Sequence, residues 1–471
     1  MLDIGHGGSI APVGGVADAT VVLEALTRHI QPHLIDAVLH QTDRCGCRRR
    51  QLPAPMMVWL VIAMGLWGDL DIPAIWRQVM GTLRSLWRVA AGRAPPTKSA
   101  LSQARGRLGA RPIRQLFVHT AAPLAADTTR GAFYRGMRLM AIDGWELALP
   151  DTPANSKAFG RPATRRHGQP VAGGYPKVQV LRLMEVGTHL SVEALIRPHD
   201  HGEYPVASAL LHQAPAGCLM LWDRGFYGYS LLKQAVDEHK HVLGRLKANV
   251  ITQRIENLGD GSYQARIYPT AKDQRRGTNA LIVRVIEYTC DDPQRPGHGQ
   301  RHRLVTTLLD AALYPAKELI VLYHERWEIE LANDEIVTHQ LARPVELRSR
   351  TPCGVVQEIY GVLLAHNAVR ALMHEAAVSV NLDPRALSFI HAVRVIRETV
   401  PWLRTASAEQ LTPMYRAMIR HIAGGRLPPR DNRINPRVVK VKMSNFAKKR
   451  PEHYHLQHPE KSFMAAIAML N

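Results

Sequence analysis

The segment MRLMAIDG at residues 137–144 sets the expected fold, because an apolar run typical of a β-strand leads directly into an aspartate. The segment CLMLWDRG at residues 218–225 repeats the pattern, with Asp223 in the place of Asp143. Further strand-like and helical runs alternate around them, which predicts a mixed α/β sheet. Catalytic groups in such sheets gather where strands end. An aspartate there is also a common turn or helix cap, and Asp310 after LVTTLL fits the same description.

Helical patterns flank the predicted sheet. Apolar residues at three- and four-residue spacing predict helices from about residue 21 to 125, and again over most of the chain after Pro315. The uncharged run from Leu52 to Gly68 is short for a membrane span, so we expect a buried helix and no membrane partner. Residues 248–310 combine a hairpin signal with alternating apolar residues, which predicts a β-rich insertion.

The chain is strongly basic, with 60 Lys and Arg against 40 Asp and Glu and a formal net charge of +20. Arginine binds phosphate through paired hydrogen bonds, so the excess favours a polyanionic partner, although an arginine-rich composition also explains it. Arg107, Arg111 and Arg114 follow an i, i+4, i+7 spacing and are expected to form one stripe of a helix. That stripe and the late basic segment with Lys440 and Lys442 predict phosphate contacts, with a solvated surface as the alternative.

The cysteines exclude a disulfide-built protein. Five cysteines in 471 residues are too few for a disulfide framework and indicate a reducing compartment. Only Cys45 and Cys47 are closely spaced, and no second Cys or His pair lies near them, so zinc is not expected. The segment MLDIGHGGSIAPVGG lacks the basic and apolar regions of a signal peptide, so we expect a cytoplasmic protein.

A third group of polar residues lies in a long predicted helix. Tyr323, Arg326 and Glu330 are spaced i, i+3 and i+7 in YHERWEIELANDEI and therefore share one helical face. Trp327 is expected to supply an apolar flank beside them. An ordinary amphipathic helix with an Arg326–Glu330 ion pair explains the same spacing.

These motifs together resemble a known family. Asp143 within AIDGWELALPDTPANSKAFG, Asp223 within DRGFYG, and Tyr323, Arg326 and Glu330 within YHERWEIELANDEI resemble the DDE transposases of bacterial insertion sequences. More specifically, they look like the insertion-element-four group with its Tyr-Arg-Glu-Lys signature. The segments LPAPMMVWLVIAMGLW, SALSQARGRLG and INPRVVKVK are similar to that group as well, so the resemblance covers about residues 30 to 450.

The resemblance implies an α/β fold with a ribonuclease-H-like catalytic core, interrupted by the β-rich insertion and flanked by helical N-terminal and C-terminal regions. It implies that Asp143, Asp223 and Glu330 are the catalytic triad and the metal ligands. The expected parts are a flexible tail over 1–20, a helical DNA-binding region over 21–125, the core over 126–247 and 311–378, the insertion over 248–310, and a helical C-terminal region with a basic tail over 379–471.

The implied reaction is displacement at phosphorus, in which negative charge on the phosphoryl group must be neutralised. Two divalent ions about 3.5–4 Å apart activate the attacking oxygen and stabilise the leaving oxygen. Carboxylates are hard oxygen ligands that suit Mg2+. We therefore expect two Mg2+ ions per active site, with Mn2+ as the alternative ion.

Several basic residues are candidates for DNA contact near this site. Tyr323 and Arg326 would face the same site as Glu330 and bind the flanking phosphates. Further DNA-binding candidates are Arg224, Lys157 and Arg161.

The chain departs from the signature at one position. Val337 stands where the family has its lysine, which removes one charge-assisted contact with phosphate. Thr338, His339 or an arginine from elsewhere could substitute for it.

The sequence therefore predicts a transposase that binds the inverted-repeat ends of its element, cleaves them and joins the 3′ ends to target DNA. The partners are element and target DNA, and holding two ends together implies at least a dimer in the synaptic complex. By resemblance, the 3′-hydroxyl cuts the second strand through a hairpin. The alternatives are a catalytically silent DNA-binding derivative and a metal-dependent endonuclease without strand transfer.

Overall fold

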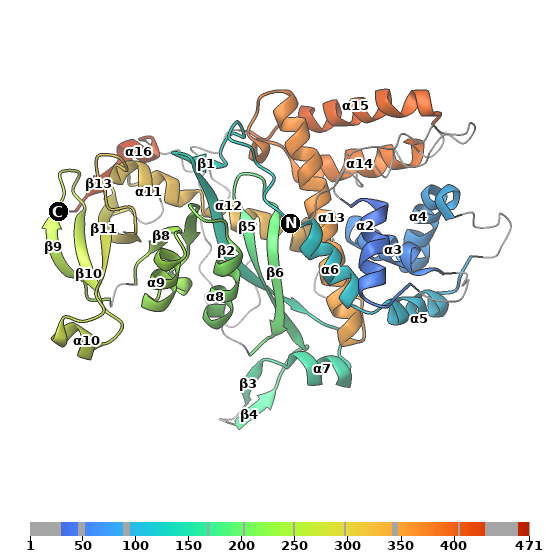
Figure 1. Cartoon of the computed structure of the whole chain (residues 1–471), viewed down its shortest axis with the longest axis horizontal. Coiled ribbons are helices and arrows are strands. Elements are labelled where there is room, and N and C mark those ends of the chain that lie inside the picture. Colours follow the sequence, from blue (N-terminus) through green and yellow to red (C-terminus); the bar gives the residue numbers. More distant parts are fainter. Residues whose placement is uncertain are drawn as a thin grey trace, which may run out of the picture.

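The computed structural model describes residues 30–45, 52–87, 95–166, 169–200, 203–247, 250–295, 298–341, 347–403, 406–428 and 460–470. Lys440 and Lys442 and the expected tail over 1–20 lie outside these ranges. Figure 1 shows a central sheet with a helical region at one end and the predicted insertion at the other. Among the described helices, none is both long and apolar enough to cross a membrane.

The central strands run in the order β6-β5-β2-β7-β8. Their bounds are β2 Met137–Ala148, β5 Lys177–Glu185, β6 Ser191–Pro198, β7 Leu219–Trp222 and β8 His241–Arg245. Strand β5 is antiparallel to both of its neighbours, β6 and β2, whereas β2, β7 and β8 are parallel. This order and these directions are those of a ribonuclease-H-like core, so the predicted fold class is confirmed.

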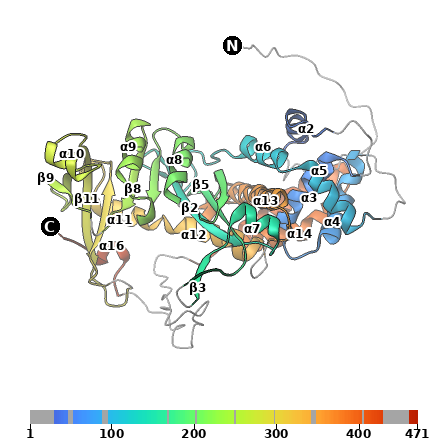
Figure 2. The same ribbon diagram turned by 90° about the horizontal axis from the view of Figure 1, so that it is seen from below.

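Each face of this sheet has its own apolar core, because side chains alternate across a strand. Met140 and Trp222 point to one face and Leu139 and Leu221 to the other. The first face is covered by α8 and α9 and the second by α11 and α12, as Figure 2 shows. The helix bounds are α8 Glu203–Gln213, α9 Tyr229–Asp237, α11 Ala316–His324 and α12 Trp327–Asp334.

Strand β2 does not end at Asp143, so that prediction is wrong. It continues to Ala148, because β5 pairs with it in antiparallel register as far as Ala148 opposite Lys177. Its parallel pairing with β7 stops earlier, at Ala141 opposite Leu221. Asp143 therefore lies just beyond the parallel part of the sheet, inside a longer strand.

The β-rich insertion extends the core sheet. Beyond β8 the strands follow in the order β12-β11-β10-β9, each antiparallel to the next. The last described segment of the chain returns to this region, because β13 pairs with β11. The bounds are β9 Gln253–Asn257, β10 Tyr263–Ile267, α10 Ala271–Arg276, β11 Leu281–Cys290, β12 His302–Thr306, α16 Phe463–Ala466 and β13 Ile467–Met469.

The helical region is built around α13, which packs along α3. The uncharged run that begins near Leu52 forms α3, and almost every side chain of that helix is buried. Helix α13 begins with Pro352 after the cap Thr351, whose side chain accepts a hydrogen bond from the Gly354 amide. The bounds are α2 Pro32–Gln41, α3 Ala54–Leu66, α4 Ile72–Trp87, α5 Lys98–Leu108, α6 Arg111–Thr120, α13 Pro352–Ser379, α14 Phe389–Leu403 and α15 Ala408–Gly424.

The predicted arginine stripe is wrong in one respect. Arg107 lies on α5, whereas Arg111 and Arg114 lie on α6. Gly109 separates the two helices with φ of 75°, a left-handed conformation that ends α5, and Pro112 suits the first turn of α6. All three arginines are exposed, so they remain candidates for phosphate contact on two helices instead of one.

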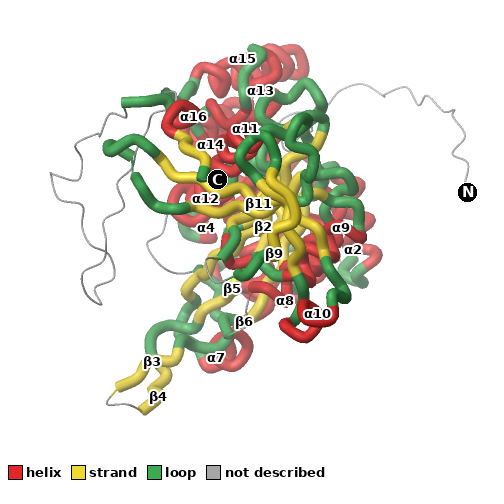
Figure 3. The backbone as a smooth tube through the Cα atoms, turned by 90° about the vertical axis from the view of Figure 1, so that its left-hand side faces the viewer, coloured by secondary structure: helices red, strands yellow, loops and turns green. Residues whose placement is uncertain are grey.

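The shorter elements lie around the core. Figure 3 shows that the β3–β4 hairpin projects from the body of the molecule. The bounds are β1 Phe133–Tyr134, α7 Pro153–Phe159, β3 Ala163–Arg166, β4 Gln169–Ala172, and the 3-10 helices η1 Arg224–Phe226 and η3 Pro384–Ala386.

We predict that the α3–α13 crossing tolerates no added methyl group. A Cβ at Gly361 would lie 2.5 Å from the Val61 carbonyl oxygen, so Gly361→Ala forces the two helices apart. We expect a loss of about 1–3 kcal/mol in the free energy of unfolding, measured by urea denaturation. Gly106→Ala is the matched control, because a Cβ there meets nothing within 4 Å. It should raise stability by up to about 1 kcal/mol, and equal losses in both variants would contradict the packing described.

Candidate active site

Asp143 and Asp223 occupy equivalent positions on neighbouring strands. The β2–β7 register pairs Ala141 with Leu221. Asp143 lies two residues further along β2, and Asp223 lies one residue past the end of β7, at the cap of η1. Strand alternation directs Asp143 to the face that Ala141 and Leu221 share, and Asp223 acts electrostatically on Tyr323 and Arg326, which belong to the same side of the sheet. That is the face covered by α11 and α12.

The predicted long helix around Glu330 is interrupted. Helix α11 ends at His324 and α12 begins at Trp327. Between them the backbone forms i→i+3 hydrogen bonds, from the Arg326 amide to the Tyr323 carbonyl at 3.1 Å and from Ile329 to Arg326 at 3.1 Å. This tighter turn places Tyr323 at the end of one helix and Arg326 at the cap of the next.

Helix α12 carries a polar stripe over the two strands. Arg326, Glu330 and Asn333 are spaced i, i+4 and i+7 and therefore share one side of the helix. The Asn333 amide donates a hydrogen bond to Asp143 Oδ2 at 2.9 Å, and Arg326 Nη2 donates to Glu330 Oε1 at 2.8 Å. The Arg326 end of the stripe lies near Asp223, which acts electrostatically on the guanidinium.

Electrostatics support this arrangement. Burial raises the pKa of Tyr323 to about 12, while the neighbouring Arg326 acts in the opposite direction. Burial alone would lower the pKa of Arg326, but Tyr323, Glu330 and Asp223 raise it overall. The Arg326 guanidinium carbon lies 5.9 Å from the centre of the Tyr323 ring. At neutral pH the pair is therefore a phenol beside a fixed cation, which suits contact with phosphate.

The carboxylates are paired with protein groups and are not gathered around one point. Glu330 is turned to Arg326, and Asp143 accepts from Asn333. Within the described ranges, no three His, Cys, Asp or Glu side chains stand close enough to hold one metal ion. The donor chemistry nevertheless fits a hard divalent cation, because Asp143 and Asp223 present carboxylate oxygens from adjacent strands.

Two neighbouring residues were missed by the sequence analysis. Asn333 could have been found, because it continues the Arg326–Glu330 stripe by one turn. Arg182 lies directly opposite Asp143 in the β2–β5 ladder and is fully buried. Its guanidinium lies 5.4 Å from the centre of the Trp145 ring. Its signal was a charged residue inside the apolar run VQVLRLMEV.

The other predicted phosphate contacts differ in their surroundings. Arg224, which directly follows Asp223, is exposed. Lys157 on α7 is exposed as well. Arg161 is engaged within the protein: it pairs with Asp151 and donates to Ser156 Oγ at 3.0 Å and the Gly174 carbonyl at 2.9 Å. The structure does not bring Arg161 to the stripe on α12.

Trp327 does not supply an apolar flank, and that prediction is wrong. Its side chain is 45% exposed, because α12 buries Ile329 and Ala332 against the sheet instead.

Asp310, the competing carboxylate, lies at the opposite edge of the sheet. Strand β12 runs antiparallel to β8, so its carboxyl end points away from the edge reached by β2 and β7. Asp310 Oδ1 accepts from the amides of Ala312 and Leu313 at 2.8 and 2.9 Å. Asp310 therefore caps a turn.

Val337 lies in a π-helical turn, η2 (Glu335–Gln340), that directly follows α12. It packs against the core of the helical region. Thr338 and His339, two candidates to replace the missing lysine, both contact Asp334, with His339 at 3.5 Å. Both side chains are thus engaged close to their own positions on the chain.

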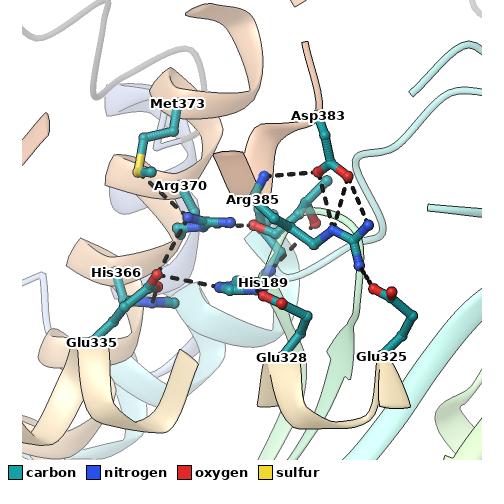
Figure 4. Close-up of polar contacts among 11 residues, drawn as sticks. His189, Glu325, Glu328, Glu335, His366, Arg370, Met373, Asp383 and Arg385 are labelled. Carbon is teal, nitrogen blue, oxygen red and sulfur yellow. Dashed lines mark hydrogen bonds and ion pairs between the residues drawn. The ribbon is translucent and has the colours of Figure 1, made fainter. Parts of the chain in front are cut away.

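A second polar cluster surrounds Glu335, the residue that directly follows α12, as Figure 4 shows. The Glu335 carboxylate contacts His189 Nδ1 at 3.3 Å, Arg370 Nη1 at 3.4 Å and His366 Nε2 at 3.0 Å. His189 also reaches Glu328 through Nε2 at 3.0 Å. Burial alone would raise the pKa of Glu335, but these three partners hold it well below its usual range.

Carboxylates on neighbouring strands of a ribonuclease-H-like sheet are typical of enzymes that transfer phosphoryl groups of nucleic acids. Two known families match this chain: "Insertion element 4 transposase N-terminal" over residues 20–118 and "Transposase DDE domain" over residues 134–368. Transposase InsG for insertion sequence element IS4, from Escherichia coli (strain K12), is 32% identical over 424 residues, which cover 89% of this chain and 92% of the relative. The chain therefore belongs to the insertion element 4 family of DDE transposases and is a DNA transposase.

Other similarities are weaker. The putative transposase InsZ of the same organism is 27% identical over 264 residues, covering 55% of this chain and 83% of the relative. The piggyBac transposase synaptic complex with hairpin DNA has a TM-score of 0.40 at 11% identity, covering 86% of this chain and 85% of that one, which is too low to establish a shared fold. DDE transposase domains generally use divalent metal ions and have DNA as their partner.

We predict a specific acid sensitivity from His366. Burial lowers the pKa of His366 to about 4, with Glu335 acting in the opposite direction, whereas an unfolded histidine titrates near ~6.5. The unfolded state therefore gains its proton first. The stabilising contribution is complete above pH ~6.5 and declines as the pH falls towards 4.

Urea denaturation at pH 7.5 and pH 5 measures this effect. The free energy of unfolding of the wild type, relative to His366→Asn, should fall by on the order of 2 kcal/mol between the two pH values. A difference that stays constant over this range would contradict the buried, neutral state of His366.

Proposed function

We propose that this transposase binds the inverted-repeat ends of its insertion sequence, cleaves them by two-metal hydrolysis and joins the 3′ ends to target DNA. The proposed catalytic and metal-binding residues are Asp143, Asp223 and Glu330. The observation that carries the proposal is the Asn333–Asp143 hydrogen bond of 2.9 Å, supported by the electrostatic effect of Asp223 on Arg326. Glu330 lies between Arg326 and Asn333 on the same stripe of α12, which supports its assignment to the side of the helix that faces the two aspartates.

The bound ions, proposed to be two Mg2+ with Mn2+ as the alternative, would supply charge neutralisation at the phosphoryl group and activation of the attacking oxygen. The protein's own residues would orient the DNA. Arg326 and Tyr323 would bind the phosphates that flank the scissile bond. A DNA phosphate that binds Arg326 would break the ion pair between Arg326 and Glu330. Glu330 would then be able to bind a metal ion, so all three carboxylates would become metal ligands only when DNA is bound.

Exposed cations extend the proposed DNA surface away from the site. Arg107, Arg111 and Arg114 lie on α5 and α6 of the N-terminal helical region. Lys157 lies on α7, and Arg224 directly follows Asp223 in the chain. Lys440 and Lys442 complete the set and lie outside the described residues.

The proposed catalytic set is tested by Asp223→Ala, with Asp310→Ala as the matched control at the opposite edge. We expect Asp223→Ala to bind a duplex carrying the element end like the wild type and to lose cleavage at least about 1,000-fold in Mg2+, because a ligand to the ion is lost. Asp310→Ala should keep wild-type cleavage. Gel analysis of end-labelled DNA measures cleavage and joining separately.

The outcomes of that assay separate the alternatives. Binding without cleavage by the wild type would indicate a catalytically silent derivative. Cleavage without joining would indicate an endonuclease. Loss of cleavage in Asp310→Ala but not in Asp223→Ala would contradict the assignment of the site.

We also propose that two chains hold two ends, since a C2 dimer is the simplest symmetric assembly. Light scattering of the protein with a duplex carrying one terminal repeat is expected to give two chains and two duplexes per complex. A complex of one chain with one duplex would contradict this arrangement.

A further inference from the structure

An acidic flank of α12 is held by basic groups from other parts of the fold. Glu328 in α12 and Glu335, which directly follows it, lie on the side away from the Arg326–Glu330–Asn333 stripe, with the buried face of Ile329 and Ala332 between them. Glu325 precedes α12, in the turn after α11. Figure 4 shows these three carboxylates directed at His189, Arg370 and Arg385.

Glu335 has the most partners of the three. His366 and Arg370 are spaced i, i+4 on α13 and both contact its carboxylate, at 3.0 and 3.4 Å. His189 contacts it from the turn between β5 and β6 at 3.3 Å. Glu335 thus joins the central helix of the helical region to the catalytic sheet.

His189 is held in an unusual conformation to make this contact. Its φ is 61°, in the left-handed region that is uncommon for residues other than glycine, although asparagine, aspartate and histidine adopt it more often than most. Its two ring nitrogens contact Glu328 and Glu335, which are seven residues apart along the helix. The His189 ring therefore contacts α12 before, and the chain just after, the buried residues Ile329 and Ala332.

Glu335 also lies at a backbone irregularity. It is the first residue of the π-helical turn, whose i→i+5 hydrogen bond runs from the Leu341 amide to the Ile336 carbonyl at 3.0 Å. A π-turn shifts the residues before it relative to those after it and is less favourable than an α-helical turn. The three partners of Glu335 hold the chain at the point where this shift begins.

Arg182 links this cluster to the active site. It is fully buried and faces Asp143 across the β2–β5 ladder, and both Asp143 and Glu335 act on its charge. Burial lowers the pKa of Arg182 to about 10, so it remains a cation at neutral pH. Asp143, a proposed metal ligand, and Glu335 thus both interact electrostatically with the same buried cation.

We propose that Glu335 is a positioning residue for the reaction: anchored by His189, His366 and Arg370, it fixes the register of α12 so that Asn333 meets Asp143 and Glu330 faces the aspartates. This inference rests on the proposed function of Glu330. Glu335 itself does not touch DNA or ions in this scheme, and it acts through the helix that carries Glu330.

The main test compares Glu335→Gln with Asp334→Asn. Both remove one carboxylate from the same junction, but Asp334 is a half-exposed side chain that contacts only residues of the following turn among those described. At saturating DNA and Mn2+, we expect Glu335→Gln to cleave about 10–100-fold more slowly than the wild type. Asp334→Asn should stay within about threefold.

Two further measurements distinguish positioning from a general loss of structure. Fluorescence anisotropy in Ca2+ should give unchanged affinity of Glu335→Gln for an element-end duplex. Hydrogen exchange followed by mass spectrometry should show faster exchange in peptides covering residues 326–340, with unchanged exchange in β2 and β7. A merely structural role would instead reduce DNA binding and protection throughout the protein in proportion to cleavage.

A second variant keeps the test decisive if Glu335→Gln does not fold. His189→Asn removes both contacts to α12, keeps the Glu335–Arg370 pair and suits the left-handed backbone. It should show the same slow cleavage with intact DNA binding. Cleavage by both variants at the rate of Asp334→Asn would overturn the positioning role. A wild type that binds element ends but does not cleave them would instead contradict the proposed function. The hydrogen-exchange experiment would then still test whether Glu335 fixes the position of α12.

Discussion

The parallel pairing of β2 with β7 is the constraint on which the site depends. Its register places Asp143 and Asp223 at equivalent positions on one face of the sheet, where neighbouring strands are about 4.8 Å apart. Both aspartates are half-buried on this face, so polar side chains on the helix that packs there stabilise them. Helix α12 provides Asn333 at one end of its stripe and Arg326 at the other.

The helical region at one end of the sheet also contacts the helix that carries the proposed site. Its central helix, α13, packs along α3 on one side and reaches Glu335 through His366 and Arg370 on the other. The orientation of α12 is therefore coupled to a core that lies far from the aspartates in sequence. On the proposed function, DNA bound on the helical region and chemistry at the sheet would therefore depend on the same packing.

Local pattern predicted the sheet, the equivalence of the two aspartates and the helical segment with Glu330, because strand alternation and helical spacing are properties of short segments. It did not predict that β2 continues past Asp143, since that depends on pairing with β5. The anchor of Glu335 was also out of reach, because His189 and Arg370 are distant in sequence and meet only in the folded chain. Arg182 could have been singled out from the sequence, because it is a charged residue within an apolar strand.

The most direct test of the account is to locate the metal on the polypeptide. Fe2+ that replaces Mg2+ in the DNA complex generates hydroxyl radicals in the presence of ascorbate and peroxide, and these cut the backbone beside the ions. The account predicts cuts close to Asp143, Asp223 and Glu330, all suppressed by excess Mg2+. Cuts near Asp310, or cuts near only one of the three residues, would contradict the claim that β2, β7 and α12 build a single active site.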